Sequence, residues 1–257
     1  MNIEILPDAG AAAARAAALV ADTVRANPRA VLGLATGGTM LPVYAELVRR
    51  HQAGTLSLAG VTSFNLDEYV GLSADHPASY HRVMAEALVA RTALRPEAVH
   101  LPRGDAPDPE AEARAYEARI AAAGGIDLQL LGLGANGHIG FNEPGSPHGS
   151  RTRTVELDEA TRTANRRFFA DGTDVPRQAI TMGIGTILDA RACLLVATGP
   201  AKVPAVAAML EGRIGPRCPA SALRTHPRVT VLLDRAAAAD LRHPEAFETR
   251  IDDSAVA

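Results

Sequence analysis

Residues 128–147 read LQLLGLGANGHIGFNEPGSP, and this stretch decides how the rest of the chain is arranged. Its apolar start runs into Gly132 and Gly134 and then turns polar, which is typical of a buried strand that ends in a loop. Open α/β sheets bind their ligands beyond the carboxyl ends of parallel strands. We therefore predict an α/β fold with a ligand site on this loop.

Three hydrogen-bonding side chains lie close together in this loop: Asn136, His138 and Glu143. A carboxylate and an amide beside an imidazole can fix its tautomer and orientation, as in proton-transfer sites. The alternative is a turn capped by His138, with Glu143 in solvent. The glycines and polar groups gathered at one strand end favour the proton-transfer site.

The composition limits the number of domains and the kinds of partner. The chain has 257 residues, of which 47% are hydrophobic and 21% are charged, and its formal net charge is −3. This length can bury one large core, so we predict a single domain over residues 1–257. A slightly acidic chain has no general basic surface, which argues against nucleic acid as a partner.

Targeting and metal-binding signals are absent from the sequence. No apolar run is long enough to span a membrane, and residues 1–10 lack the charged and apolar regions of a secretory signal. We therefore expect a cytoplasmic protein with no membrane partner. Cys193 and Cys218 have no metal-ligand spacing, so we interpret both as structural thiols.

Strand and helix patterns alternate along the chain. Helical spacing of apolar residues predicts helices over 11–26, 41–52, 78–91, 108–123 and 203–210. Short apolar runs predict strands over 30–35, 61–66, 99–101, 192–197 and 229–234, in addition to the strand that opens 128–147. Five or six strands alternating with helices predict a doubly wound, mostly parallel sheet with helices on both faces.

Two features indicate a site for an anion. Residues 36–39 read TGGT and join a predicted strand to a predicted helix, where backbone N–H groups and the helix dipole favour negative charge. This turn is neither a P-loop nor a dinucleotide fingerprint, and a plain tight turn is the alternative. Lys202 lies in the first turn of another predicted helix, where the dipole disfavours its charge unless an anion binds nearby.

Two adjacent carboxylates follow the strand predicted at 61–66. Neighbouring side chains of a strand point to opposite faces, so Asp67 or Glu68 can point into a cleft and act as a general base. Both carboxylates can equally be solvated. Their position alone does not choose between them.

A basic segment follows the central loop. Residues 150–178 are rich in arginine and threonine and show little sustained periodicity. A long irregular segment inside a compact domain is typical of a lid or binding loop, so we predict a lid here. The polar tail from about residue 243 is predicted to be loosely held.

Seven motifs occur in order: TGGT (36–39), FNLDEYVGL (64–72), HPASY (76–80), GLGANGHIGFNEP (132–144), SRTR (150–153), NRRFF (165–169) and TGPAK (198–202). In this order they resemble the glucosamine-6-phosphate deaminase family, from about residue 2 to about residue 241. The resemblance implies an aldose–ketose isomerase and deaminase of amino-sugar catabolism. Such an enzyme converts glucosamine 6-phosphate and water to fructose 6-phosphate and ammonium, with no organic cofactor or metal.

The resemblance also implies a role for individual residues. Asp67 would move a proton between C2 and C1 of the sugar, and His138 would open the sugar ring. Glu143 and Asn136 would orient and tune His138. The substrate phosphate would rest on Gly37, Gly38, Thr39, Arg167 and Lys202.

Two positions depart from the family pattern. Some members have aspartate where this chain has Asn136, and an amide cannot accept charge from His138 as a carboxylate can. We therefore expect ring opening to depend more on Glu143. Allosteric hexameric members carry a basic residue where this chain has Val155, which argues against activation by an amino sugar. The oligomeric state stays open, a homo-oligomer included.

Two other functions fit the same fold. A 6-phosphogluconolactonase-like enzyme would hydrolyse a lactone and release no ammonia, and a non-catalytic sensor would bind a sugar phosphate without turnover. The LDEY and NGHIGFNEP motifs favour the deaminase over the lactonase. All candidate acid–base residues are present, and no helix-turn-helix segment precedes them, which argues against the sensor.

Overall fold

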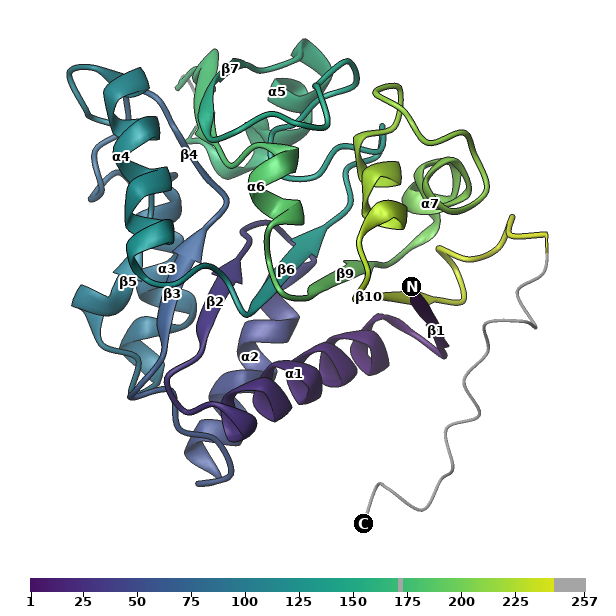
Figure 1. Cartoon of the computed structure of the whole chain (residues 1–257), viewed down its shortest axis with the longest axis horizontal. Helices are drawn as coiled ribbons and strands as arrows, with labels where there is room; N and C mark the ends of the chain where they lie inside the picture. The colour runs from purple at the N-terminus through teal and green to yellow at the C-terminus, as the bar shows by residue number, and fades with distance from the viewer. Residues whose placement is uncertain (171–172, 243–257) are drawn as a thin grey trace.

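The computed structural model describes residues 1–170 and 173–242. Its centre is a seven-stranded sheet in the order β1-β10-β9-β6-β2-β3-β5, with every neighbouring pair parallel (Figure 1). These strands are β1 (Asn2–Leu6), β2 (Val31–Leu34), β3 (Thr62–Asn65), β5 (Val99–His100), β6 (Leu128–Gly132), β9 (Cys193–Ala197) and β10 (Val229–Asp234). The parallel α/β sheet predicted from the sequence is confirmed.

The sheet has one strand more than the five or six that the sequence predicts. The additional strand is β1, which pairs along its whole length with β10, from the opposite end of the chain. Its sequence NIEIL is too short and too mixed in polarity to stand out as a buried strand. Only the pairing with β10 makes it part of the sheet.

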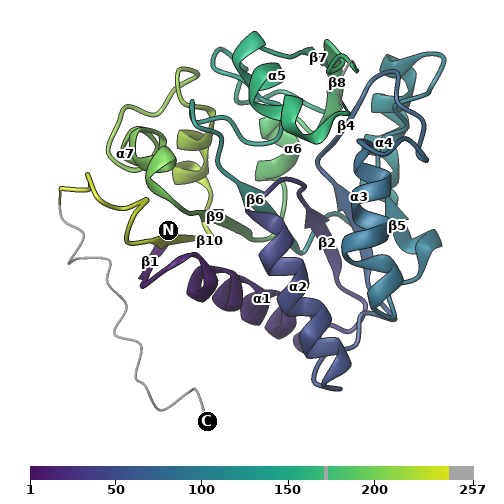
Figure 2. The same ribbon diagram turned by 180° about the vertical axis from the view of Figure 1, so that it is seen from behind.

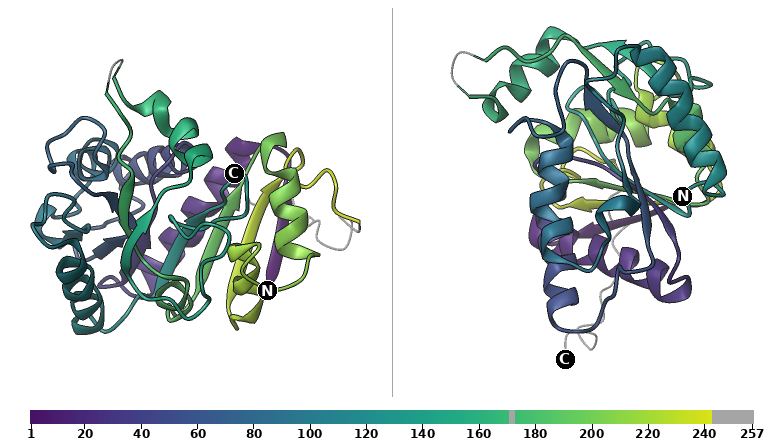
Figure 3. Two further views of the ribbon diagram at one scale, coloured as in Figure 1. Left: turned by 90° about the horizontal axis from the view of Figure 1, so that it is seen from above. Right: turned by 90° about the vertical axis from the view of Figure 1, so that its left-hand side faces the viewer.

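Helices cover both faces of the sheet (Figure 3). The helices α1 (Ala9–Ala26) and α2 (Met40–Gln52) lie side by side (Figure 2), while α4 (Pro109–Ala122) and α6 (Ile184–Leu188) pack on the opposite face. α1 begins after Asp8, whose carboxylate accepts a hydrogen bond from the Ala11 N–H at 2.8 Å. The remaining helices are α3 (Tyr80–Ala87), α5 (Glu159–Asn165) and α7 (Val203–Leu210), with 3₁₀ turns η1 (Val89–Arg91), η2 (Pro96–Ala98), η3 (Arg166–Phe168), η4 (Pro200–Lys202) and η5 (Pro219–Thr225).

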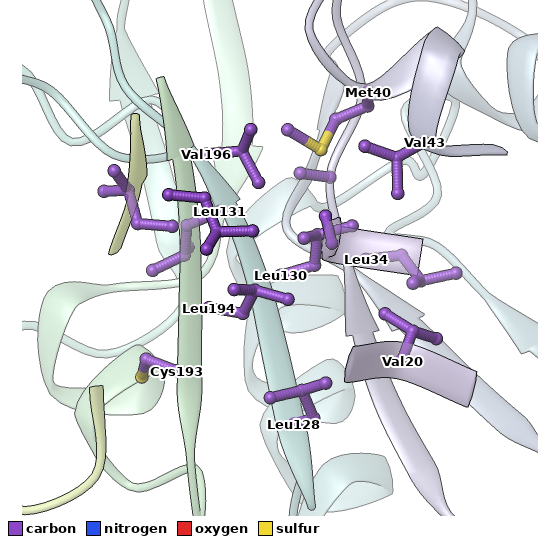
Figure 4. Packing of buried hydrophobic residues seen from close by; sticks show 14 of the residues in the cluster. Val20, Leu34, Met40, Val43, Leu128, Leu130, Leu131, Cys193, Leu194 and Val196 are labelled. Atoms are coloured by element: carbon purple, nitrogen blue, oxygen red, sulfur yellow. The ribbon is translucent and has the colours of Figure 1, made fainter. Parts of the chain in front are cut away.

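The main core lies between the central strands and the helices that cover them. Figure 4 shows Leu34 of β2, Leu130 of β6 and Leu194 of β9 in the same cluster as Val20 of α1 and Met40 of α2. All five side chains are buried. Burying each large apolar side chain stabilises the fold by roughly 1.5–3 kcal/mol, and this packing holds the carboxyl ends of the strands in fixed positions.

A second, antiparallel sheet lies beyond the carboxyl ends of the parallel strands (Figure 1). It consists of β4 (Asp67–Tyr69), β8 (Gln178–Thr181) and β7 (Arg153–Glu156), in that order. The prediction that residues 150–178 are irregular is wrong, since β7, α5 and η3 all lie within this segment. β7 is stabilised by pairing with β8, which a local search for periodicity does not detect.

The other sequence-based expectations have mixed outcomes. The helix expected at 78–91 is split into α3 and the 3₁₀ turn η1. Cys193 and Cys218 are buried free thiols, and burial raises the pKa of Cys193 to about 12, which keeps it unreactive. In the described part of the chain, no helix is long and apolar enough to cross a membrane. The tail from residue 243 lies outside the described residues.

Candidate active site

Most candidate residues lie just beyond the carboxyl ends of four adjacent strands. In the sheet, β9, β6, β2 and β3 are neighbours and parallel, so the loops after their carboxyl ends lie at one edge. Following the chain, β2, β3 and β5 are added one after another toward one edge of the sheet. The next strand of this sheet, β6, then pairs with β2 on its other side. This reversal is the topological switch point at which α/β sheets bind ligands. Lys202 of η4 follows β9, the Asn136–Glu143 loop follows β6, TGGT follows β2, and Asp67, the first residue of β4, follows β3.

The Asp67 carboxyl group is buried beside the loop that follows β6. It is only 6% exposed, and a Cβ added to Gly140 would lie 3.3 Å from Asp67 Oδ2. Burial, and secondly the charge of Glu68, raise the pKa of Asp67 to about 8, although a hydrogen bond from the Thr181 hydroxyl opposes the shift. A carboxyl group that titrates near neutral pH is suited to taking and returning a proton.

Glu68 points to a different part of the structure. Its carboxylate is fully buried and accepts hydrogen bonds from the N–H groups of Tyr69 at 2.8 Å and His81 at 3.1 Å. The Nδ1 atom of His81 lies 2.9 Å from the same carboxylate. Because His81 belongs to the first turn of α3, Glu68 serves the amino end of that helix. Asp67 is therefore the better candidate for a base, a choice that the sequence positions leave open.

The three polar residues of the central loop meet as the sequence predicts. Asn136 Nδ2 donates to Glu143 Oε2 at 2.7 Å, and His138 Nδ1 lies 3.2 Å from the same oxygen. The His138 N–H donates to Asn136 Oδ1 at 3.1 Å, which closes the group. With Nδ1 held by a carboxylate, the other ring nitrogen is available as a base.

The His138 ring lies directly against Gly134. A Cβ added to this glycine would lie 2.3 Å from the imidazole atoms Cδ2 and Nε2, closer than real atoms approach. A side chain at this position would therefore displace the ring. The glycine that marks the end of β6 in the sequence also makes room for the candidate base.

Glu143 is ionised despite its burial. Burial alone would raise its pKa, but hydrogen bonds from His138, Thr161 and Asn136 outweigh this effect and hold the pKa below its usual range. The Thr161 hydroxyl, from α5, donates to Oε1, the oxygen that Asn136 and His138 do not use. Glu143 therefore carries a negative charge beside the candidate base.

The TGGT turn is open on its outer side. Gly37 has a φ of 116°, a conformation that favours glycine, and a Cβ on Gly37 or Gly38 would have no atom within 4 Å. Thr39 precedes the first residue of α2, and its side chain makes no capping hydrogen bond. The amino end of a 13-residue helix is thus accessible to an anion.

Lys202 and Arg167 come together in space. Lys202 ends η4 immediately before α7, a small correction to the helical first turn that the sequence predicts. Its pKa is lowered by burial and secondly by the charge of Arg167, which lies on η3. Two cations close enough for one to lower the pKa of the other favour the binding of an anion between them.

Comparison with known proteins identifies the family. Residues 8–232 match the family model described as glucosamine-6-phosphate isomerases/6-phosphogluconolactonase. The chain belongs to this family. The glucosamine-6-phosphate deaminase of Rhodopirellula baltica is 54% identical over 238 residues, which cover 93% of this chain and 95% of that protein. The glucosamine-6-phosphate deaminase of Shewanella loihica is 50% identical over 96% of this chain and 92% of its own length.

Solved structures of the glucosamine-6-phosphate isomerase/6-phosphogluconolactonase family share this architecture. One, described as a monomeric glucosamine-6-phosphate deaminase, is 47% identical and has a TM-score of 0.91, covering 93% of this chain and 99% of its own. The 6-phosphogluconolactonase of Trypanosoma brucei is 21% identical with a TM-score of 0.73, covering 93% and 98%. At that identity the likeness shows the fold alone.

Two threonines that contact candidate site residues were not predicted from the sequence. Thr161 binds Glu143, and Thr181 accepts a hydrogen bond from the Phe141 N–H at 3.1 Å while its own hydroxyl bonds to Asp67. Both threonines belong to the part of the chain around the second sheet. No motif or spacing marks them, because each is defined by a contact with a distant segment.

The best-defined cavity of the described residues lies away from this site. A cavity of about 500 Å³ lies at the amino ends of β6, β9 and β10, lined in part by Leu128, Cys193 and Arg228. It is at the opposite edge of the sheet from the acid–base residues. Over residues 1–170 and 173–242, no cluster of three or more His, Cys, Asp or Glu side chains is placed to hold a metal ion.

Proposed function

We propose that this chain is a glucosamine-6-phosphate deaminase, which converts glucosamine 6-phosphate and water to fructose 6-phosphate and ammonium. The observation that carries the proposal is the presence of two separate acid–base groups beyond the carboxyl ends of the parallel strands. One is the His138–Glu143 pair, and the other is the buried Asp67 carboxyl group. Relatives about half identical over most of the chain carry the name of this enzyme.

Ring opening is assigned to His138. The reaction requires a group that removes the proton of the anomeric hydroxyl and returns one to the ring oxygen. A neutral imidazole performs both halves near pH 7, provided that its tautomer is fixed. Glu143 accepts from Nδ1 and Asn136 ties Glu143 to the same loop, so we assign the proton transfer to the opposite ring nitrogen.

Isomerisation is assigned to Asp67. In the open-chain sugar, the Asp67 carboxylate removes the proton from C2 and delivers it to C1, passing through an enolamine to a ketimine. Water then adds to C2, and the nitrogen leaves as ammonia, which takes up a proton to become ammonium. The pKa of about 8 places this group where it can both take up and release a proton at neutral pH.

Phosphate binding is assigned to Gly37, Gly38, Thr39, Arg167 and Lys202. The first three supply backbone groups at the amino end of α2, and the last two supply charge. Arg167 lies on η3, within the segment over residues 150–178, and we propose that this segment acts as a lid over the sugar.

Lys202→Ala and Arg167→Ala are each expected to raise the KM for glucosamine 6-phosphate by about tenfold or more. Each removes a charge-assisted hydrogen bond to phosphate, worth roughly 1.5–3 kcal/mol. Steady-state kinetics should show a much smaller effect on any activity toward unphosphorylated glucosamine. Arg166→Ala is the matched control, since Arg166 is an exposed neighbour on the same 3₁₀ turn. Equal losses on both substrates would place the phosphate elsewhere.

A coupled assay for ammonium and fructose 6-phosphate tests the function directly. A deaminase forms both products in equal amounts from glucosamine 6-phosphate. A lactonase instead releases acid from 6-phosphogluconolactone and forms no ammonium, and a sensor binds the sugar phosphate without turnover. Absence of both products, with the protein folded and binding the substrate, would exclude the proposed function.

We propose that the enzyme works without activation by an amino sugar. Val155 lies on β7 and packs against the hydrophobic cluster that contains Tyr69 and Phe141. An apolar side chain in such surroundings offers no charge to a phosphate group.

The structural relative at 47% identity is described as monomeric, and we propose the same state for this chain. Light scattering of the purified protein measures it.

A further inference from the structure

Helix α5 contacts Glu143 of the candidate site and leads directly to Arg167. Thr161 donates its hydroxyl to Glu143, and Asn165, four residues further on, donates to the Tyr69 hydroxyl at 2.9 Å. Residues four apart lie on the same face of a helix, so one face of α5 packs against both Glu143 and Tyr69. Arg167 follows directly in η3. The same short segment therefore holds the acid–base carboxylate and carries the proposed phosphate ligand.

We propose that Thr161 is a positioning residue, whose hydroxyl holds the Glu143 carboxylate in the orientation that fixes the His138 ring. This inference rests on the proposed deaminase function. Thr161 itself does not touch the sugar. It acts through Glu143, and its effect therefore reaches the reaction through the state of His138.

The two oxygens of Glu143 have separate partners. Oε2 is shared between Asn136 Nδ2 at 2.7 Å and His138 Nδ1 at 3.2 Å, whereas Oε1 receives the Thr161 hydroxyl. A carboxylate bound at both oxygens cannot turn about its terminal bond without breaking a contact. If the Oε1 contact is lost, rotation becomes easier and Oε2 no longer stays in line with the imidazole.

Burial prevents water from replacing the threonine easily. Thr161 is 7% exposed and Glu143 is 8% exposed. A buried charged group that loses a donor without a substitute is destabilised in its charged form. The hydroxyl of Thr161 therefore favours ionised Glu143, and its removal should raise the pKa of this carboxyl group.

Thr161→Val tests the proposal, because valine has nearly the same shape and lacks the hydroxyl. We expect kcat at neutral pH to fall by about tenfold, with KM for glucosamine 6-phosphate changed by less than about threefold. The acidic limb of the pH profile of kcat/KM should move to higher pH by about one unit, the scale of one hydrogen bond to a charged group. The sign follows because a raised pKa leaves Glu143 protonated up to a higher pH.

Two further variants separate the hydroxyl from the shape of the side chain. Thr161→Ser keeps the donor and should restore kcat to within about threefold of the wild type, with the original pH profile. Thr163→Val makes the same change at an exposed position of α5. It should leave both kcat and the pH profile of kcat/KM unchanged. Thermal unfolding checks that each variant is folded. A wild-type pH profile for Thr161→Val, or equal losses for Thr161→Val and Thr161→Ser, would overturn the proposal.

A measurement without turnover distinguishes this inference from the proposed function. The carboxyl carbon of Glu143 can be titrated by ¹³C NMR in the substrate-free wild type and in Thr161→Val. An upward shift of the Glu143 pKa in the variant supports the proposed role of the Thr161 hydroxyl, whatever reaction the enzyme performs. An unchanged pKa of Glu143 in the variant would overturn the proposal, even if the coupled assay shows a deaminase.

Discussion

Asp67→Asn is expected to lower kcat for ammonium release by about 100-fold or more, the usual scale for loss of a general base, with little change in KM. Asparagine has almost the shape of aspartate but cannot take the proton from C2. The phosphate and the sugar hydroxyls keep their partners, so binding should persist. Stopped assays for ammonium measure kcat, and circular dichroism checks the fold.

Glu68 provides the comparison for this variant. Its carboxylate holds the amino end of α3, so Glu68→Gln should lower the melting temperature and affect kcat less than Asp67→Asn does. Near wild-type turnover by folded Asp67→Asn would show that Asp67 is not the base. In that case the raised pKa of Asp67 would be a consequence of burial without a catalytic role.

The pH dependence of stability reports on the same carboxyl group. Folding raises the pKa of Asp67 from an ordinary value of 3.8 to about 8 through burial and the charge of Glu68. Between these values the folded protein holds a proton that the unfolded chain releases, so this group lowers the free energy of unfolding as pH rises from about 4 to about 8. Denaturant unfolding should therefore show Asp67→Asn gaining stability relative to the wild type over that range. A constant difference would contradict the raised pKa.

His138→Gln is expected to reduce deamination of glucosamine 6-phosphate by about 100-fold or more, because the substrate enters mainly as a closed ring. Glutamine can hydrogen-bond to Glu143 but cannot exchange a proton near neutral pH. Chemistry on the open chain should depend on this residue less. The loss should therefore be largest for steps that include ring opening.

Hydrogen exchange separates the two roles. With fructose 6-phosphate and ammonium supplied, exchange of hydrogen at C1 with solvent requires Asp67 and should be largely retained in His138→Gln. Asp67→Asn should lose exchange and deamination together. His51→Gln, in the last turn of α2, is a control histidine away from the candidate site. Equal loss of exchange and deamination in His138→Gln would contradict separate roles for the two residues.

Much of the main sheet follows from local patterns in the sequence. Leu128–Gly132 and Val229–Asp234 are mostly apolar runs, as expected of strands that are buried on both faces in a parallel sheet. β1 was missed because NIEIL carries no such run, and β7 was missed because its residues are only partly buried. Both strands are defined by distant pairing partners. Their stability comes from contacts that no local window contains.

The candidate site divides in the same way. The sequence by itself determined the α/β class and the loop that carries Asn136, His138 and Glu143, because these residues are neighbours along the chain. By position alone the sequence left Asp67 and Glu68 open, and the family resemblance favoured Asp67. Only the tertiary structure showed that Glu68 holds the amino end of α3, and only it brought Thr161 onto Glu143 and Arg167 within range of the Lys202 charge. The physical reason is that burial, charge and hydrogen bonding depend on which side chains meet in space. For these residues the partners come from segments that only folding brings together.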